Sequence, residues 1–234
     1  FKRAYSCEGM RPKFALMNPE LTFTLPDYQT ACGVTDMYAH VLERYFTNTP
    51  NTVIIDRLAE GVLKTLIDVA PRVLQDPQNY DLRAEIMWCG TIAHNNTVGV
   101  GREQDWASHN IEHELSAKYD IAHGAGLAIV FPAWMTYCYK HDIKRFVMYA
   151  KNVYGVQTQG KSDEEIALEG IACTKAFFQK IGMPVSLREL NVEINDDILM
   201  EMACKVARNP HGKVGNFVRL SPEDIVEIYK LALD

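Results

Sequence analysis

The stretch that decides the fold is Trp106-Ala-Ser-His-Asn-Ile-Glu-His-Glu-Leu-Ser-Ala-Lys-Tyr-Asp-Ile-Ala-His-Gly124. Apolar residues recur in it every three or four positions, which is typical of an amphipathic helix. His109 and His113 lie four residues apart, so a helix presents both on one face. A continuous helix would carry His123 ~15 Å beyond His113, so a turn must return it if it is to join them. The stretch therefore predicts two helices joined by a turn, with histidines on both.

A second pair of candidate metal ligands, Asp36 and His40, lies earlier in the chain. Their spacing of four again places both side chains on one face of a predicted helix. The two windows together hold four of the seven histidines, and apolar residues flank both. One carboxylate with neutral imidazoles and no thiolate suits Fe²⁺ or Zn²⁺ better than Ca²⁺ or Mg²⁺. The pattern predicts a divalent-metal site, and the alternative is a helical bundle whose histidines are buried and hydrogen-bonded.

The fold class expected is all-α, because helical periodicity continues through most of the chain. Helices are predicted over residues 27–47, 52–74, 80–95, 105–118, 123–139, 142–153, 162–181, 196–208 and 222–233. His94, near the end of the third helix, is expected to cap its carboxyl end, and Ser221 to cap the last helix at its start. Residues 12–17 form a short apolar run that predicts a buried strand, although no later segment resembles a partner for it.

Composition excludes several classes of function. Apolar residues make up 47% of the chain and charged residues 23%, as in an ordinary globular protein. The net charge is −6 and basic residues form no run, so a nucleic-acid partner is not expected. The longest uncharged apolar run is about 16 residues, short of a membrane span. Six cysteines without a CxxC motif predict reduced thiols and a cytoplasmic location.

No dinucleotide or phosphate loop of the GxGxxG or GxxxxGK[ST] kind follows a strand in this chain. The chain also begins at Phe1 instead of methionine. We therefore expect a piece of a larger protein that has no nucleotide-binding fold of its own.

The motifs resemble those of the iron-containing (group III) alcohol dehydrogenases, in their C-terminal half. The likeness rests on Asp36-x-x-x-His40, His109-x-x-x-His113 and a following His123-Gly. It includes the segment Gln104-Asp-Trp-Ala-Ser and covers essentially the whole chain. It is greatest for the butanol dehydrogenase and aldehyde reductase branch. One departure is Ala122, where many members have proline; it is expected to change the turn and not the ligand.

The resemblance implies a role for each motif residue. The metal ligands would be Asp36, His40, His109 and His123, binding Fe²⁺ or Zn²⁺. His113 would be a non-ligand histidine beside the nicotinamide and the substrate, either relaying the hydroxyl proton to solvent or orienting its neighbours.

The resemblance also implies a larger assembly. Residues 1–26 would be a trailing strand and interdomain segment, and residues 27–234 an all-helical, metal-binding catalytic domain. A missing N-terminal domain would bind NADPH or NADH, with Leu21 and Thr24 as additional cofactor contacts or as plain linker. The whole enzyme, expected to be a homodimer, would interconvert butanol-like primary alcohols and aldehydes, and the isolated fragment would have little activity.

Two other functions stay open on the sequence. The same ligands could activate water in a metal-dependent hydrolase, for which Glu103, Asp105 or Glu112 would have to be the base. The histidines could also be structural, in a non-catalytic helical domain.

Overall fold

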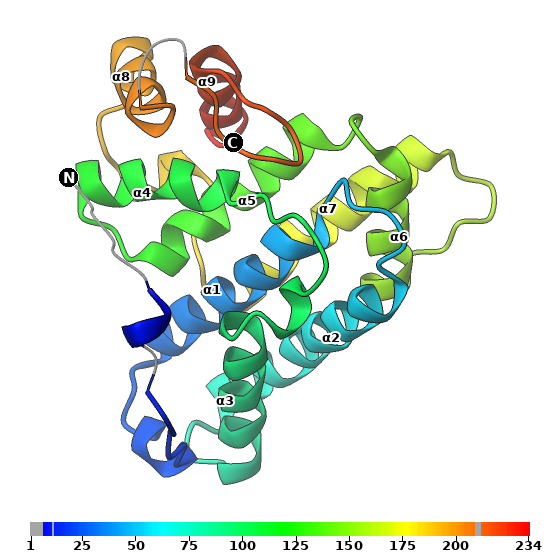
Figure 1. The fold of residues 1–234 in the computed structure, drawn as a ribbon. Coiled ribbons are helices and arrows are strands. Elements are labelled where there is room, and N and C mark those ends of the chain that lie inside the picture. The colour runs from blue at the N-terminus through cyan, green and yellow to red at the C-terminus, as the bar shows by residue number, and fades with distance from the viewer. Residues whose placement is uncertain (1–6, 11, 209–211) are drawn as a thin grey trace.

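The computed structural model describes residues 7–10, 12–208 and 212–234, and in this part of the chain the fold is all-α without a β-sheet (Figure 1). Its α-helices are α1 (Asp27–Tyr45), α2 (Val53–Gln75), α3 (Tyr80–His94), α4 (Ala107–Tyr119), α5 (His123–Cys138), α6 (Ile143–Tyr154), α7 (Asp163–Lys180), α8 (Asp196–Val206) and α9 (Pro222–Leu231). The predicted helices and the all-α class are confirmed, with ends that differ by at most two residues. None of the described helices combines the length and hydropathy that crossing a membrane requires.

The strand predicted over residues 12–17 is wrong, because this segment has no regular secondary structure. Its side chains Phe14 and Leu16 are 79% and 89% exposed. A strand needs a neighbouring strand to satisfy its backbone groups, and no segment among the described residues pairs with it. The chain instead enters the short 3₁₀ helix η2 (Pro19–Thr22). Residues 1–6 of the predicted trailing segment lie outside the described residues.

Helix α1 is the central element of the core, since it packs against α2, α3 and α5 (Figure 1). Its side chains Tyr38, Val41, Leu42 and Tyr45 are fully buried. Each such burial contributes ~1.5–3 kcal/mol, so α1 is a rigid support for the residues on its remaining face. Asp36 and His40 are on that face, each only partly buried.

The turn between α4 and α5 is where the sequence predicts it. Asp120 adopts a left-handed conformation with φ 53°, and its N–H donates to the carbonyl of Ser116 at the end of α4. A single left-handed residue ends a helix by reversing the chain direction. Helix α5 then begins at His123 and packs back against α4, which returns His123 toward His109.

Candidate metal centre

Four candidate ligands from three helices meet around one carboxylate oxygen, Asp36 Oδ1. The Nε2 atoms of His40, His109 and His123 lie 3.6, 3.6 and 3.3 Å from it. Helix α1 supplies Asp36 and His40, α4 supplies His109, and α5 supplies His123. The structure thus brings together the four residues that the family resemblance implies as ligands.

The donor atoms of this cluster fit a divalent cation. Asp36 Oδ1 and His109 Nε2 are both buried and have no hydrogen-bond partner. Buried polar atoms are nearly always paired, so two orphaned acceptors aimed at one point indicate a missing positive ligand. The ligand atoms of Asp36, His109 and His123 lie within 4.8 Å of one another. Imidazole nitrogen and carboxylate oxygen are donors that both Fe²⁺ and Zn²⁺ accept.

His109 is held in place by a buried carboxylate on α1. Glu43 is 1% exposed, and its Oε1 lies 2.8 Å from His109 Nδ1. The same carboxylate accepts hydrogen bonds from the backbone N–H groups of His109 and Trp106 at the start of α4. The proton on Nδ1 therefore points to Glu43, which leaves the Nε2 lone pair facing Asp36, as in metal sites where a carboxylate orients the ligating histidine.

His123 has an equivalent partner, Glu112, which is fully buried on α4. Its Oε2 is hydrogen-bonded to His123 Nδ1, and its Oε1 accepts from the hydroxyl of Ser116. Gly126 makes room for this carboxylate, since a Cβ there would lie 2.6 Å from Glu112 Oε1. Sequence reasoning named Glu112 only as a base for a hydrolase and did not foresee Glu43. The sequence did offer a signal for both residues: Glu43 follows the motif residue His40 in the same helix, and Glu112 directly precedes His113.

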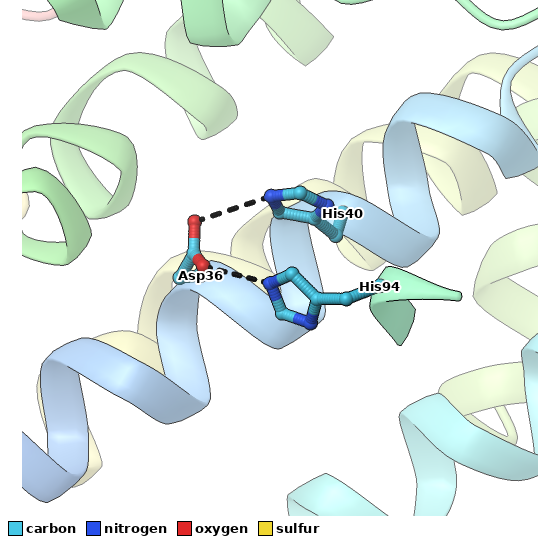
Figure 2. Close-up of side chains that lie close together, drawn as sticks. All are labelled: Asp36, His40 and His94. Atoms are coloured by element: carbon cyan, nitrogen blue, oxygen red, sulfur yellow. Dashed lines mark hydrogen bonds and ion pairs between the residues drawn. The ribbon is translucent and has the colours of Figure 1, made fainter. Parts of the chain in front are cut away.

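His94 is the second residue that sequence reasoning missed. It ends α3, and its Nδ1 lies 2.8 Å from the carbonyl oxygen of Gly90, consistent with the predicted contact at the helix end. Its Nε2, however, lies 3.1 Å from Asp36 Oδ2. Figure 2 shows His94 and His40 side by side and both directed at Asp36.

The charges of the cluster favour an ionised Asp36. Burial alone would raise its pKa, but the surrounding imidazoles, led by His109, hold the pKa of Asp36 well below its usual range. Burial lowers the pKa of His40 to about 3 against the pull of Asp36. For His109, burial is outweighed by Asp36 and Glu43, which raise its pKa to about 9. Asp36 therefore offers a bound cation a full negative charge at the point that the imidazoles share.

The remaining predicted site residues border this cluster. The half-buried His113 on α4 has its ring centroid 5.2 Å from that of His123. Leu21 in η2 and the nearby Thr24 are both exposed. No contact among the described residues tests their proposed role in binding a cofactor.

Comparison with known proteins gives one consistent family. The chain is 44% identical over 223 residues to the probable NADH-dependent butanol dehydrogenase 2 of Bacillus subtilis, covering 95% of this chain and 57% of that protein. It is 42% identical over 195 residues to the NADPH-dependent aldehyde reductase YqhD of Escherichia coli, covering 82% of this chain and 49% of that one. The chain thus spans about half the length of these relatives.

A solved structure of similar fold is that of NADH-dependent butanol dehydrogenase A from Thermotoga maritima. It superposes with a TM-score of 0.89 at 39% identity over 98% of this chain and 58% of that one. Residues 30–233 match the family model described as Fe-containing alcohol dehydrogenase family, C-terminal. The chain therefore belongs to the iron-containing alcohol dehydrogenase family.

Proposed function

We propose that the protein is a metal-dependent oxidoreductase that interconverts butanol-like primary alcohols and aldehydes with NADH or NADPH, and that this chain supplies the metal site. The observation that carries the proposal is the cluster at Asp36, where the buried Asp36 Oδ1 and His109 Nε2 have no hydrogen-bond partner. Relatives named as butanol dehydrogenases and as an aldehyde reductase support the reaction class.

In this proposal Asp36, His40, His109 and His123 hold Fe²⁺ or Zn²⁺. The ion would polarise the substrate oxygen and the reduced nicotinamide would supply the hydride. Three neutral imidazoles and one carboxylate offset only one of the two positive charges of such an ion. The protein ligands therefore leave positive charge available to an oxygen atom of the substrate.

Glu43 and Glu112 keep this arrangement rigid. Each accepts a hydrogen bond from the Nδ1 side of one imidazole, so the Nε2 atoms of His109 and His123 stay directed at Asp36. Both carboxylates are almost completely buried, and water does not compete for them. Preorganised ligands spare the site from reorganising as charge develops on the substrate oxygen.

In this proposal His113 transfers the proton of the substrate hydroxyl group. It is one helical turn after His109 on α4, and its half-buried ring lies beside that of His123. An imidazole exchanges protons near neutral pH, so His113 can pass a proton between the substrate oxygen and solvent.

The nucleotide is assigned mainly to an N-terminal domain that this chain lacks, with Leu21 and Thr24 as contacts from this side. Residues 27–234 would then be the helical catalytic domain and residues 1–26 the connection to its partner. A homodimer is part of the proposal on the strength of the family resemblance. A cytoplasmic location is supported by the six cysteines, all of which are free thiols.

The hydrolase alternative has less support, because two of its candidate bases are already engaged. Glu112 is bonded to His123 and Ser116. Asp105 is 4% exposed and accepts hydrogen bonds from the backbone of Asn216 and Phe217.

The proposal is tested on the protein that includes the preceding nucleotide-binding segment. Reduction of butanal should consume NADH or NADPH, should stop when the metal is removed by a chelator, and should resume on adding Fe²⁺ or Zn²⁺. The Asp36→Ala variant should not regain butanal reduction when Fe²⁺ or Zn²⁺ is added. Turnover that survives metal removal would contradict the proposal, as would full-rate turnover by this chain without the segment.

A further inference from the structure

His94 brings a fourth helix, α3, to the candidate metal centre. Helix α3 packs closely on α1 one turn before His94, where a Cβ on Gly90 would lie 2.9 Å from the methyl carbon of Met37. The carbonyl oxygen of this same Gly90 lies 2.8 Å from His94 Nδ1. The ring is therefore fixed from behind by its own helix, and its Nε2 edge is directed toward α1.

The two oxygens of Asp36 have different surroundings. Oδ1 faces the three histidines His40, His109 and His123 and has no hydrogen-bond partner. Oδ2 lies 3.1 Å from His94 Nε2 and accepts a hydrogen bond from it. Because Nδ1 also faces an oxygen acceptor, the ring carries a proton on both nitrogens in this arrangement. A carboxylate can rotate about its terminal bond, and a hydrogen bond to one oxygen determines where the other one points.

His94 also packs on His40, the other candidate ligand of α1. The two ring centroids are 4.0 Å apart with an interplanar angle of 36°. On its Nδ1 side His40 faces the guanidinium of Arg44 at 3.5 Å, instead of a buried carboxylate like those of His109 and His123. The candidate ligands of α4 and α5 thus have Glu43 and Glu112 as partners, whereas His94 contacts both candidate ligands of α1.

We propose that His94 is a positioning residue of the metal centre, which holds Asp36 Oδ2 so that Oδ1 faces the ion and which supports the ring of His40. The inference rests on the proposed metal-dependent function. His94 is not assigned as a ligand, because its Nε2 faces Oδ2, whereas His40 faces the other oxygen of Asp36 (Figure 2). His109 and His123 also face that other oxygen, Oδ1.

The experiment measures the affinity of the purified protein for Zn²⁺ and Co²⁺ by competition with a coloured chelator. His94→Leu keeps an apolar side chain against His40 but cannot donate to Asp36, so its affinity should fall about 10–100-fold while the stoichiometry stays at one ion. His94→Gln can donate to Oδ2 and should recover most of the affinity and the Co²⁺ absorption spectrum of the wild type. His141→Leu is the matched control, since His141 is exposed and bonds to Asn48.

The outcomes separate this proposal from the proposed function. If His94→Leu binds the ion as tightly as the wild type, or if His94→Gln is no better than His94→Leu, the positioning role is wrong and the metal centre stands. If the wild type itself binds no stoichiometric ion, both proposals fail. Melting of all variants in excess chelator accompanies the affinities. Equal melting temperatures with unequal affinities are expected, because a merely structural role would lower both.

Discussion

Gly124 lies directly against the backbone of Cys32, because a Cβ atom built on this glycine would be 2.2 Å from the carbonyl oxygen of Cys32. Gly124 is in the first turn of α5 and Cys32 is one turn before Asp36 on α1. The contact therefore brings His123, the neighbour of Gly124, to 3.3 Å from Asp36. The sequence alone offers a glycine after a histidine, and the structure gives the reason for it.

Replacing Gly124 with alanine should push α5 away from α1. We expect a loss of about 1–3 kcal/mol in the free energy of unfolding and weaker metal binding, since an added methyl group here meets backbone atoms that cannot yield. Denaturant unfolding and a metal titration measure the two effects. Gly61→Ala is the control, because a Cβ at Gly61 in α2 meets nothing within 4 Å. Equal stability of the two variants would contradict the prediction.

Glu43→Gln should weaken the metal site without disrupting the fold. The amide retains one acceptor oxygen but directs its N–H₂ at donors that the carboxylate satisfied, so we expect about 10–100-fold lower metal affinity. Chelator competition measures it. Glu60→Gln is the matched control, since Glu60 is also buried but bonds to Tyr45 and Asn152. A similar loss of affinity in both variants would show that the effect is general destabilisation.

Asp105 should make the stability of the metal-free protein depend on pH. Burial and the nearby charge of Glu43 raise the pKa of Asp105 from 3.8 to about 7, although backbone N–H groups oppose the shift. A raised carboxyl pKa means that the folded state holds a proton that the unfolded state has released. This contribution to stability is therefore present below the unfolded pKa and is lost as pH rises from about 4 to about 7.

Denaturant unfolding of the wild type and of Asp105→Asn in chelator, over this pH range, tests the assignment. The free energy of unfolding of Asp105→Asn should lack the pH dependence that falls between the unfolded and the folded pKa of Asp105. Identical slopes in the two proteins would exclude Asp105 as the titrating group.

Asp56 should be a major contributor to stability away from the metal centre. This buried carboxylate binds Arg102 at 2.8 Å and Arg145 at 2.6 Å. We expect Asp56→Asn to lose about 3–5 kcal/mol in the free energy of unfolding, because the buried Arg102 and the partly buried Arg145 then lose their counter-charge. The exposed pair of Asp68 and Arg72 gives the comparison, and Asp68→Asn should cost about 0–1 kcal/mol. Thermal unfolding that ranks the two variants equally would refute the difference.

The helices were predictable because their signals are local. Ser221 caps α9 through the capping box with Asp224 that the sequence displays. Asp120 ends α4 in the left-handed conformation at the predicted turn. The strand over residues 12–17 was not predictable in the same way, since an apolar run becomes a strand only when another segment pairs with it.

The partners of the site residues depend on tertiary contacts that no spacing rule gives. Glu43 meets His109 across 66 residues of sequence, and His94 meets Asp36 across 58. Periodicity places each side chain on a face of its own helix, but the packing of α3 and α5 on α1, and of α4 on α5, decides which faces meet. The four candidate ligands could be named from motif likeness, whereas the residues that orient them required the structure.

Metal stoichiometry is the most direct test of the account. Elemental analysis of the purified protein after saturation with Fe²⁺ or Zn²⁺ and removal of free ion should give one ion per chain. Asp36→Ala and His123→Ala should give none. A wild type without a bound ion, or variants that bind it as well as the wild type, would contradict the account.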